Sequence, residues 1–231
     1  MKFPKAHPVV LGTVTTPSGL RYLARKELPV DAVEVRIDAL LAQKMPVEEI
    51  EAALRKKKHA VLLTLRIAAE GGQYAWKVAD RRNLFLRFLP RVEAIDVELA
   101  TARAMQPVID EARRTGKTVV LSAHAIEKPA SSAQVARWVG RFDPLPSTIL
   151  KIAARIRSWR DLQQLAALLV NHPDWPLAVM GLGPYAAQSR SVLMALGSRL
   201  VYGYLDQPAA PSQPSAAEVK KMVHSVRNLE G

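Results

Sequence analysis

Residues 118–153, TVVLSAHAIEKPASSAQVARWVGRFDPLPSTILKIA, contain two short aliphatic runs separated by a longer segment. The runs Thr118–His124 and Thr148–Ala153 are almost continuously apolar, as is typical of parallel strands that helices cover. Two such strands in one direction require a long crossover between them, and the intervening segment is long enough to provide it. This stretch therefore predicts an α/β unit with a parallel sheet.

The same alternation extends through the chain on both sides of this stretch. Six further strands are predicted, at Pro8–Val14, Ala32–Asp38, Ala60–Arg66, Ala94–Leu99, Leu177–Leu182 and Arg199–Leu205. Eight strands alternating with helical segments predict a (β/α)8 TIM barrel. An open doubly wound sheet is the alternative, but no Gly-x-Gly-x-x-Gly motif follows the first strand. No linker divides the sequence, so we expect residues 1–231 to form a single domain.

Helix signals occupy the gaps between most of these strands. One apolar stripe ends at Ala112, just before Gly116, which is a typical residue at a helix end. Ser158 and Asp161 have the spacing of a capping box at a helix start. A last helix is predicted over Ala216–Asn228.

The composition excludes several classes of protein. The 231 residues include no cysteine, which excludes disulfides, thiolate metal sites and cysteine nucleophiles and fits a reducing compartment. No apolar stretch is long enough for a membrane span, and the N-terminal segment lacks the features of a signal peptide. We therefore expect a cytoplasmic protein that does not associate with membranes.

The net charge of +12 permits two interpretations. It could indicate an anionic partner such as nucleic acid, or it could be a solvated basic surface. The densest basic run, Arg55–His59, ends a predicted helix that has Glu48 and Glu49 in its first turn. Because this arrangement complements the helix dipole, the structural interpretation is favoured for the run.

Polar residues gather where the predicted strands end. In a TIM barrel the carboxyl ends of the strands form the functional face, so side chains at these ends are candidates for one site. These residues are Glu34, Arg36, Asp38, Arg66, Glu70, Asp96, Glu98, His124 and Lys151. Such a set suits a polar, anionic molecule that carries a carbonyl group.

Lys151 lies in the apolar run Ile149–Ala153. A lysine inside the barrel is costly unless it is paired or neutral. Desolvation and nearby arginines would favour the neutral amine, which can attack a ketone. The alternative is a lysine that extends outwards between the helices.

His124 ends the neighbouring strand and could exchange protons with an intermediate bound to the lysine. Taken alone, it could equally be a structural histidine, and Glu70 a solvated loop acid. Arg36, Arg66 and Arg190 are candidates for binding carboxylate and hydroxyl groups, although each could be an internal ion-pair partner, for example Arg36 with Glu34 or Asp38. No set of His, Asp and Glu residues has metal-ligand spacing, so no metal is predicted.

At these positions the sequence resembles the type I 3-dehydroquinate dehydratase family. The similar segments are Glu34–Asp38, Leu63–Arg66, Glu70–Gly72, Ser122–His124, Lys151–Ala153, Met180–Gly181, Ser189–Arg190, Gly197–Ser198 and Ala210–Gln213. Their order and spacing cover nearly the whole chain.

The resemblance implies a role for each matching residue. Lys151 would form an imine with the substrate, His124 would move protons, and Glu70 would orient His124. Arg190 and Gln213 would bind the substrate carboxylate. The remaining implied contacts are the hydroxyl-binding residues Glu34, Arg36 and Arg66 and the apolar wall residues Met180, Leu182 and Tyr202. The covalent imine on Lys151 would require no cofactor.

The sequence departs from the family pattern at two places. The family usually has a Tyr before the histidine and an Asp-Phe pair after it, where this chain has Ala123, Ala125 and Ile126. The family's Ser-Ala-Pro-Gly-Gln loop has Ala209 in place of the serine and Ser212 in place of the glycine. The Pro-rich segment 207–214 is interpreted as a loop over the active site.

Three hypotheses follow from the sequence. The first is dehydration of 3-dehydroquinate to 3-dehydroshikimate, a step in aromatic amino acid biosynthesis. The second is a diverged Schiff-base lyase or aldolase acting on another hydroxy-keto acid, and the third is a catalytically silent barrel that binds an anionic partner. Because Lys151, His124 and Glu70 are all present, the third is disfavoured and nucleic acid is not expected as a partner. A homodimer is expected by analogy with the family.

Overall fold

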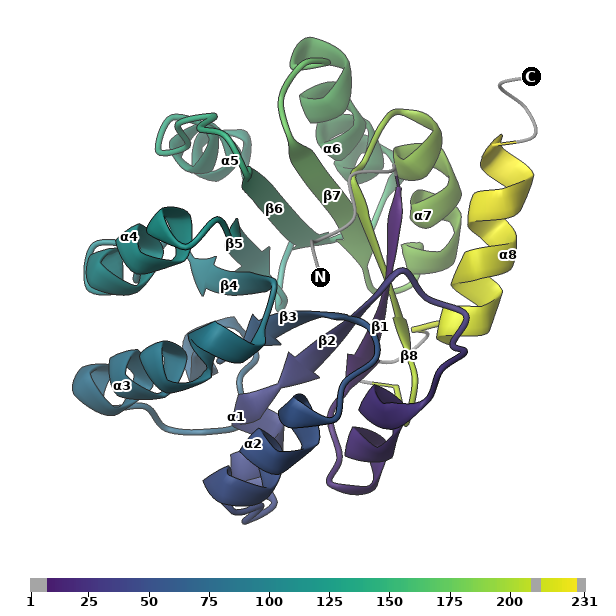
Figure 1. Ribbon diagram of the computed structural model, residues 1–231. Helices are drawn as coiled ribbons and strands as arrows, with labels where there is room; N and C mark the ends of the chain where they lie inside the picture. The colour runs from purple at the N-terminus through teal and green to yellow at the C-terminus, as the bar shows by residue number, and fades with distance from the viewer. Residues whose placement is uncertain (1–7, 209–212, 228–231) are drawn as a thin grey trace.

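Parallel strands form one curved sheet at the centre of the molecule, and helices surround it (Figure 1). The computed structural model describes residues 8–208 and 213–227. The eight strands are β1 (Val9–Val14), β2 (Ala32–Arg36), β3 (Ala60–Thr64), β4 (Ala94–Glu98), β5 (Thr118–Ala125), β6 (Thr148–Arg155), β7 (Leu177–Leu182) and β8 (Leu200–Tyr204). The order β7-β6-β5-β4-β3-β2-β1-β8 confirms the predicted (β/α)8 barrel.

A serine side chain helps to close the barrel between β7 and β8. The Ser198 hydroxyl donates to the carbonyl of Val179 at 3.0 Å and accepts from the Val179 N–H at 2.9 Å. Beside it, the Arg199 N–H donates to the Leu177 carbonyl at 2.8 Å. β7 and β8 are the first and last strands of the sheet, and the described residues form no ladder of backbone hydrogen bonds between them. The bonds of Ser198 and Arg199 connect the two strands instead.

Helices fill the gaps between the strands as predicted. The α-helices are α1 (Ile37–Ala42), α2 (Val47–Arg55), α3 (Val78–Phe88), α4 (Gln106–Arg114), α5 (Ser132–Val139), α6 (Trp159–Asn171), α7 (Ala186–Ala195) and α8 (Ala216–Arg227). Short 3-10 helices are η1 (Ser18–Ala24), η2 (Ala68–Glu70) and η3 (Leu89–Arg91). The capping box of Ser158 and Asp161 is present at the start of α6. The predicted end of the last helix, Asn228, lies outside the described residues.

The predicted end of the second strand is wrong. Strand β2 stops at Arg36, and Asp38 belongs to α1. The buried Asp38 carboxylate accepts from the backbone N–H groups of Arg66 at 3.2 Å and Gln73 at 3.1 Å. A turn of helix brings the carboxylate to these donors. The apolar sequence pattern from which the strand was predicted does not indicate this turn.

The barrel interior changes from apolar to polar towards the carboxyl ends of the strands. Leu62 and Val120 belong to the apolar inner core, and the next residues on the same face are Thr64 and Ser122. Lys151 takes the corresponding place on β6, because it pairs with Ser122 in the strand register. The fold therefore brings the polar strand ends together over an apolar floor.

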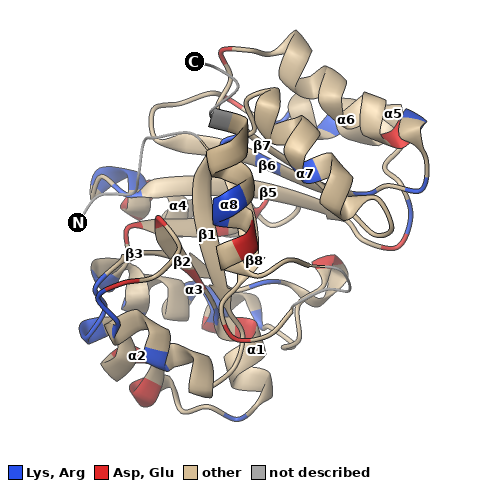
Figure 2. Ribbon diagram, turned by 90° about the vertical axis from the view of Figure 1, so that its right-hand side faces the viewer, with Lys and Arg blue, Asp and Glu red and all other residues tan. Residues whose placement is uncertain are grey.

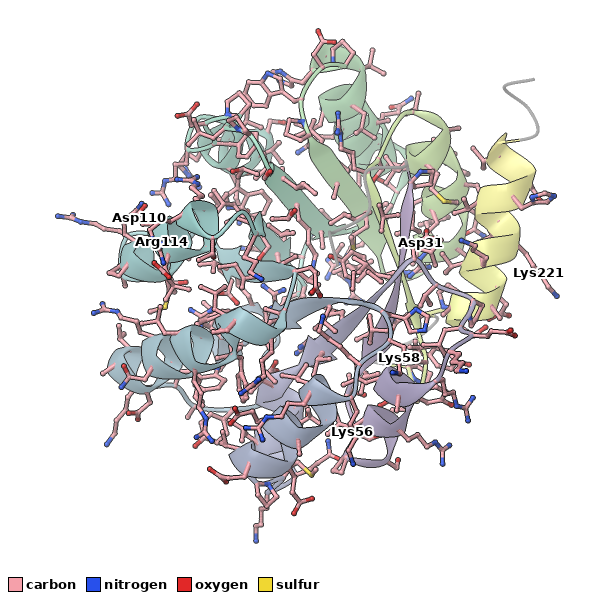
Figure 3. The ribbon with its side chains drawn as sticks, in the orientation of Figure 1. Asp31, Lys56, Lys58, Asp110, Arg114 and Lys221 are labelled. Atoms are coloured by element: carbon pink, nitrogen blue, oxygen red, sulfur yellow. The ribbon has the colours of Figure 1, made fainter. Side chains whose placement is uncertain are left out.

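The basic run after α2 lies on the outside of the molecule and has acidic neighbours. Arg55 pairs with Glu51 at 3.0 Å and Lys57 with Glu93 at 2.6 Å, while Lys56 and Lys58, which are labelled in Figure 3, are exposed. Figure 2 shows basic and acidic residues side by side on α2 and on α8. These contacts support the structural interpretation of the run. Within the described part of the chain, no helix is long and apolar enough to cross a membrane.

Candidate active site

The residues to which the resemblance gives a role line one pocket of about 290 Å³ at the carboxyl ends of the strands, whereas the candidates Asp38, Asp96 and Glu98 do not line it. All eleven are present in its wall: Glu34, Arg36, Arg66, Glu70, His124, Lys151, Met180, Leu182, Arg190, Tyr202 and Gln213. They come from most of the strands and from the segments that follow them, as a TIM-barrel site requires.

Lys151 points into the barrel and is almost completely buried. Its side chain is 5% exposed, and its Nζ donates to Asp96 Oδ2 at 3.0 Å. On another side, Nζ lies 4.3 Å from the centre of the Tyr202 ring. The alternative of an outward-pointing lysine is therefore excluded.

Asp96 is one of the strand-end candidates, but the resemblance gives it no role. It does not line the pocket, yet it contacts Lys151 directly. In addition to Lys151, its carboxylate pairs with Arg66 at 2.9 Å and accepts from the Ser122 hydroxyl at 2.6 Å. Burial opposes ionisation, but Arg66 and Lys151 outweigh it and hold the pKa of Asp96 well below its usual range. The available signal was an acidic residue on the inward face of an apolar strand, two residues before the strand ends at Glu98.

A chain of buried charges continues from Asp96 to the outside of the barrel. Arg66 Nη1 donates to Glu98 Oε1 at 3.0 Å, and the other oxygen of Glu98 accepts from Arg81 of α3. Arg81 also donates from Nε to the Leu65 carbonyl at 2.8 Å. Arg66 is thus both a wall of the pocket and an internal ion-pair partner.

His124 and Glu70 form a hydrogen-bonded pair, with 2.7 Å between Nδ1 and Oε2. Burial, together with the positive charges of Arg66 and Lys151, lowers the pKa of His124 well below 6.5, so the imidazole is neutral near neutral pH. Burial and the carboxylates of Glu98 and Asp96 raise the pKa of Glu70 to about 7. When Glu70 is ionised, it accepts from Nδ1–H and leaves Nε2 as a free base.

A tight turn at Gly71-Gly72 holds Glu70 in place. Gly71 has a φ of 87°, which favours glycine, and follows Glu70 directly at the end of η2. A Cβ at Gly72 would lie 2.2 Å from the Arg66 carbonyl oxygen, so only glycine fits there. The turn therefore folds Glu70 back towards His124.

Arg36 and Glu34 have internal partners as well as pocket surface. Arg36 binds Asp38 through two bonds, from Nε at 2.9 Å and from Nη2 at 2.7 Å, so the alternative of an internal ion pair holds for this residue. Glu34 accepts from the hydroxyls of Thr13 at 2.9 Å and Thr64 at 2.8 Å. These bonds fix both side chains at the pocket wall.

Arg190 of α7 differs from the other two arginines of the pocket. Its Nη1 is buried and has no hydrogen-bond partner among the described residues. Burial lowers the pKa of its guanidinium, and no charged group among the described residues opposes this effect. A partly buried cation without a counter-charge is suited to binding an anionic group.

The remaining wall is apolar. Met180 and Leu182 of β7 line it with Tyr202, and Ile126, one of the departures from the family pattern, lies in the same wall. Gln213 also lines the pocket, whereas residues 209–212 of the predicted loop, including Ala209, lie outside the described residues. In the described ranges, no group of three or more His, Cys, Asp or Glu residues could hold a metal ion.

The fold and this pocket define a class: α/β-barrel proteins with a buried lysine beside a neutral histidine, an arrangement suited to imine chemistry. Residues 10–230 match the family model of type I 3-dehydroquinase, and the chain belongs to this family.

Individual relatives agree with the family model. The chain is 30% identical over 213 residues to a 3-dehydroquinate dehydratase of Methanosarcina acetivorans, covering 87% of each chain. It is 28% identical over 207 residues to the enzyme of the same name from Klebsiella pneumoniae, covering 84% of this chain and 81% of that one.

Solved structures support the fold. A type I 3-dehydroquinate dehydratase from Clostridium difficile, covalently modified by comenic acid, superposes with a TM-score of 0.84 at 20% identity, covering 97% of this chain and 94% of that chain. A 3-dehydroquinate dehydratase from Geobacillus kaustophilus gives a TM-score of 0.85 at 20% identity, covering 97% and 93%.

Proposed function

We propose that this protein is a 3-dehydroquinate dehydratase, a hydro-lyase that converts 3-dehydroquinate to 3-dehydroshikimate through an imine on Lys151. The observation that carries the proposal is the buried Lys151 in one pocket with the His124–Glu70 pair. Enzymes of the type I family use a lysine Schiff base and need no cofactor. The proposed chemistry needs only the side chains of this pocket and the substrate.

The first step is imine formation. Lys151 gives a proton to His124, and its neutral amine attacks the carbonyl carbon of the substrate. The carbonyl oxygen takes up one proton from the attacking amine and one returned by His124 and leaves as water, so that a C=N bond replaces the C=O bond. Asp96, 3.0 Å from Nζ, holds the amine in place and balances the positive charge of the protonated imine.

His124 carries out the elimination. Its free Nε2 removes a proton from the carbon next to the imine, and the electron pair moves into the imine as an electron sink. The hydroxyl on the following carbon then leaves as water with a proton returned by His124. Hydrolysis of the imine releases the unsaturated ketone and restores Lys151.

The substrate contacts follow the charges of the pocket. Arg190, which lacks a counter-charge in the described structure, binds the substrate carboxylate with help from Gln213. Glu34, Arg36 and Arg66 contact the hydroxyls from fixed positions. The apolar face of the ring lies against Met180, Leu182 and Tyr202.

The deciding experiment is incubation with 3-dehydroquinate and borohydride, followed by intact-mass measurement and peptide mapping. A reduced adduct on Lys151 is expected, together with rising absorbance from the conjugated product. The matched control is Lys117→Ala, which removes a lysine outside the pocket and should leave the adduct unchanged. If the wild-type protein forms no adduct and no conjugated product, the proposal is wrong.

The proposal extends to the state of the protein. We propose that residues 1–231 act as one domain, supported by the single sheet to which every strand belongs. A homodimer and a cytoplasmic location are proposed by analogy with the family and from the absence of cysteine. Light scattering at several concentrations tests the dimer, and fractionation of the source cells tests the location.

A further inference from the structure

The ring of Tyr202 contacts the Lys151 nitrogen directly, in addition to lining the apolar wall of the pocket. It lies on β8, while Asp96 lies on β4 and Lys151 on β6, so three alternate strands converge on one nitrogen atom. Nζ lies 3.0 Å from the Asp96 carboxylate and 4.3 Å from the centre of the Tyr202 ring. The nitrogen therefore contacts both a carboxylate and an aromatic face.

We propose that Tyr202 is a positioning residue for the lysine chemistry, with its ring face holding the positively charged Lys151 nitrogen as the ammonium ion and as the protonated imine. The inference deepens the proposed function and rests on it for the imine state. A cation over an aromatic face is stabilised by a factor of roughly 2 to 5 at an exposed site and by roughly 30 in a desolvated one.

The ring face, and not the hydroxyl, is the part of Tyr202 that acts on the nitrogen. The hydroxyl oxygen is buried and has no hydrogen-bond partner in the described part of the chain, so it makes no bond to Lys151. Burial, reinforced by Glu34 and Asp96, raises the pKa of Tyr202 well above 10.0, and the phenol stays neutral. Tyr202 therefore provides no negative charge that could act as a counter-ion.

Imine formation makes the ring contact more important. The lysine ammonium has three N–H donors, whereas the protonated imine keeps its positive charge with one N–H. A carboxylate loses hydrogen bonds in this change, but an aromatic face attracts the charge without needing an N–H. The ring can thus hold the nitrogen through both states.

The test measures the free protein, so that it does not depend on the identity of the substrate. Brief acetic anhydride pulses label the Lys151 amine between pH 6 and 11, and mass spectrometry of the peptide gives the rate. In Tyr202→Leu the curve of rate against pH is expected to move towards lower pH by about half a unit to one and a half units, because the ammonium loses its stabilisation. Tyr202→Phe keeps the ring and should give the wild-type curve.

Faster labelling of Lys151 in Tyr202→Leu could also arise because the reagent reaches the lysine more easily. The curve of rate against pH distinguishes this explanation from a loss of ammonium stabilisation. A merely wider pocket raises the rate at every pH without moving the curve, and this result would overturn the inference. So would a shift in Tyr202→Phe as large as that in Tyr202→Leu. Tyr204→Leu, which removes another ring from β8, is the control and should leave the curve in place, with circular dichroism confirming the fold of each variant.

A second measurement covers the imine. The fraction trapped by borohydride with 3-dehydroquinate should fall several-fold in Tyr202→Leu and stay near wild type in Tyr202→Phe. If the wild-type protein traps no adduct, the proposed function fails, while the labelling curves still decide whether the ring holds the ammonium ion.

Discussion

Lys151 Nζ and Asp96 Oδ2 lie 3.0 Å apart inside the barrel, where neither side chain has more than 5% of its surface exposed. A buried ion pair holds its two members in one geometry, and removal of either one leaves an uncompensated charge. Asp96 also forms an ion pair with Arg66, so its carboxylate is the counter-ion of two cations. The position of the lysine thus depends on a residue that does not line the pocket.

Asp96→Asn is expected to destabilise the protein strongly. The amide keeps the shape of the carboxylate but leaves Lys151 and Arg66 without their shared counter-ion. We expect a loss of about 3 to 5 kcal/mol in the free energy of unfolding, measured by urea titration. Asp110→Asn, on the exposed side of α4 (Figure 3), should unfold like the wild type. Equal stability of Asp96→Asn and wild type would contradict the role of this pair.

His124→Ala is expected to separate imine formation from elimination. Lys151 keeps its partners, so borohydride should still trap an adduct with 3-dehydroquinate. Loss of the proton-transferring group should lower kcat by about 10²- to 10⁴-fold, measured by product absorbance. His59→Ala, outside the pocket, is the control. A variant that keeps more than a tenth of wild-type kcat would assign the proton transfer to another group.

Glu70→Gln should change the pH dependence of stability. The pKa of Glu70 is raised from 4.5 to about 7 in the folded protein, so its ionisation destabilises the fold as the pH rises through this range. The neutral amide avoids this cost. Above pH 8 the variant should be more stable than wild type by about 1 to 3 kcal/mol, whereas near pH 4 the two should be equal. Urea titrations at both pH values give the difference, and the opposite sign would refute the raised pKa.

Arg190→Met should weaken substrate binding while stabilising the fold. The guanidinium is partly buried without a counter-charge in the described structure, so its replacement removes a desolvation cost. We expect KM to rise by roughly ten- to a hundredfold, since a hydrogen bond to a charged group contributes about 1.5 to 3 kcal/mol. Steady-state kinetics and thermal unfolding measure the two effects. Arg160→Met, an exposed change on α6, should alter neither, and an unchanged KM in Arg190→Met would place the carboxylate elsewhere.

The sequence predicted most of the fold because its strongest signals are local. Each apolar run became a strand, and the Ser158–Asp161 capping box begins a helix as expected. The predicted end of β2 was wrong because the position of Asp38 depends on hydrogen bonds from the backbone of Arg66 and Gln73. These residues lie far from Asp38 in the sequence, so a local pattern does not indicate the bonds.

Most residues of the site could be predicted because the carboxyl ends of the strands meet on one face of a TIM barrel. That rule, with the family resemblance, brought together residues as distant as Glu34 and Gln213 in one pocket. Asp96 was among the strand-end candidates but had no predicted role, because it lies below the pocket surface and acts through Lys151. Two further features could not be predicted, because both depend on what surrounds a side chain in space. They are the lack of a partner for Arg190 Nη1 among the described residues and the place of the Tyr202 ring.

The chain of charges from Lys151 through Asp96, Arg66 and Glu98 to Arg81 also constrains how this protein can evolve. Each member neutralises its neighbours, so a single substitution is selected against even when it lies far from the substrate, as Arg81 does on α3. Met180 and Leu182 are apolar and form no ion pairs, so each can be substituted independently. Changes in substrate preference among descendants are therefore expected to accumulate on the apolar side of the pocket, while the charged side is inherited as a unit.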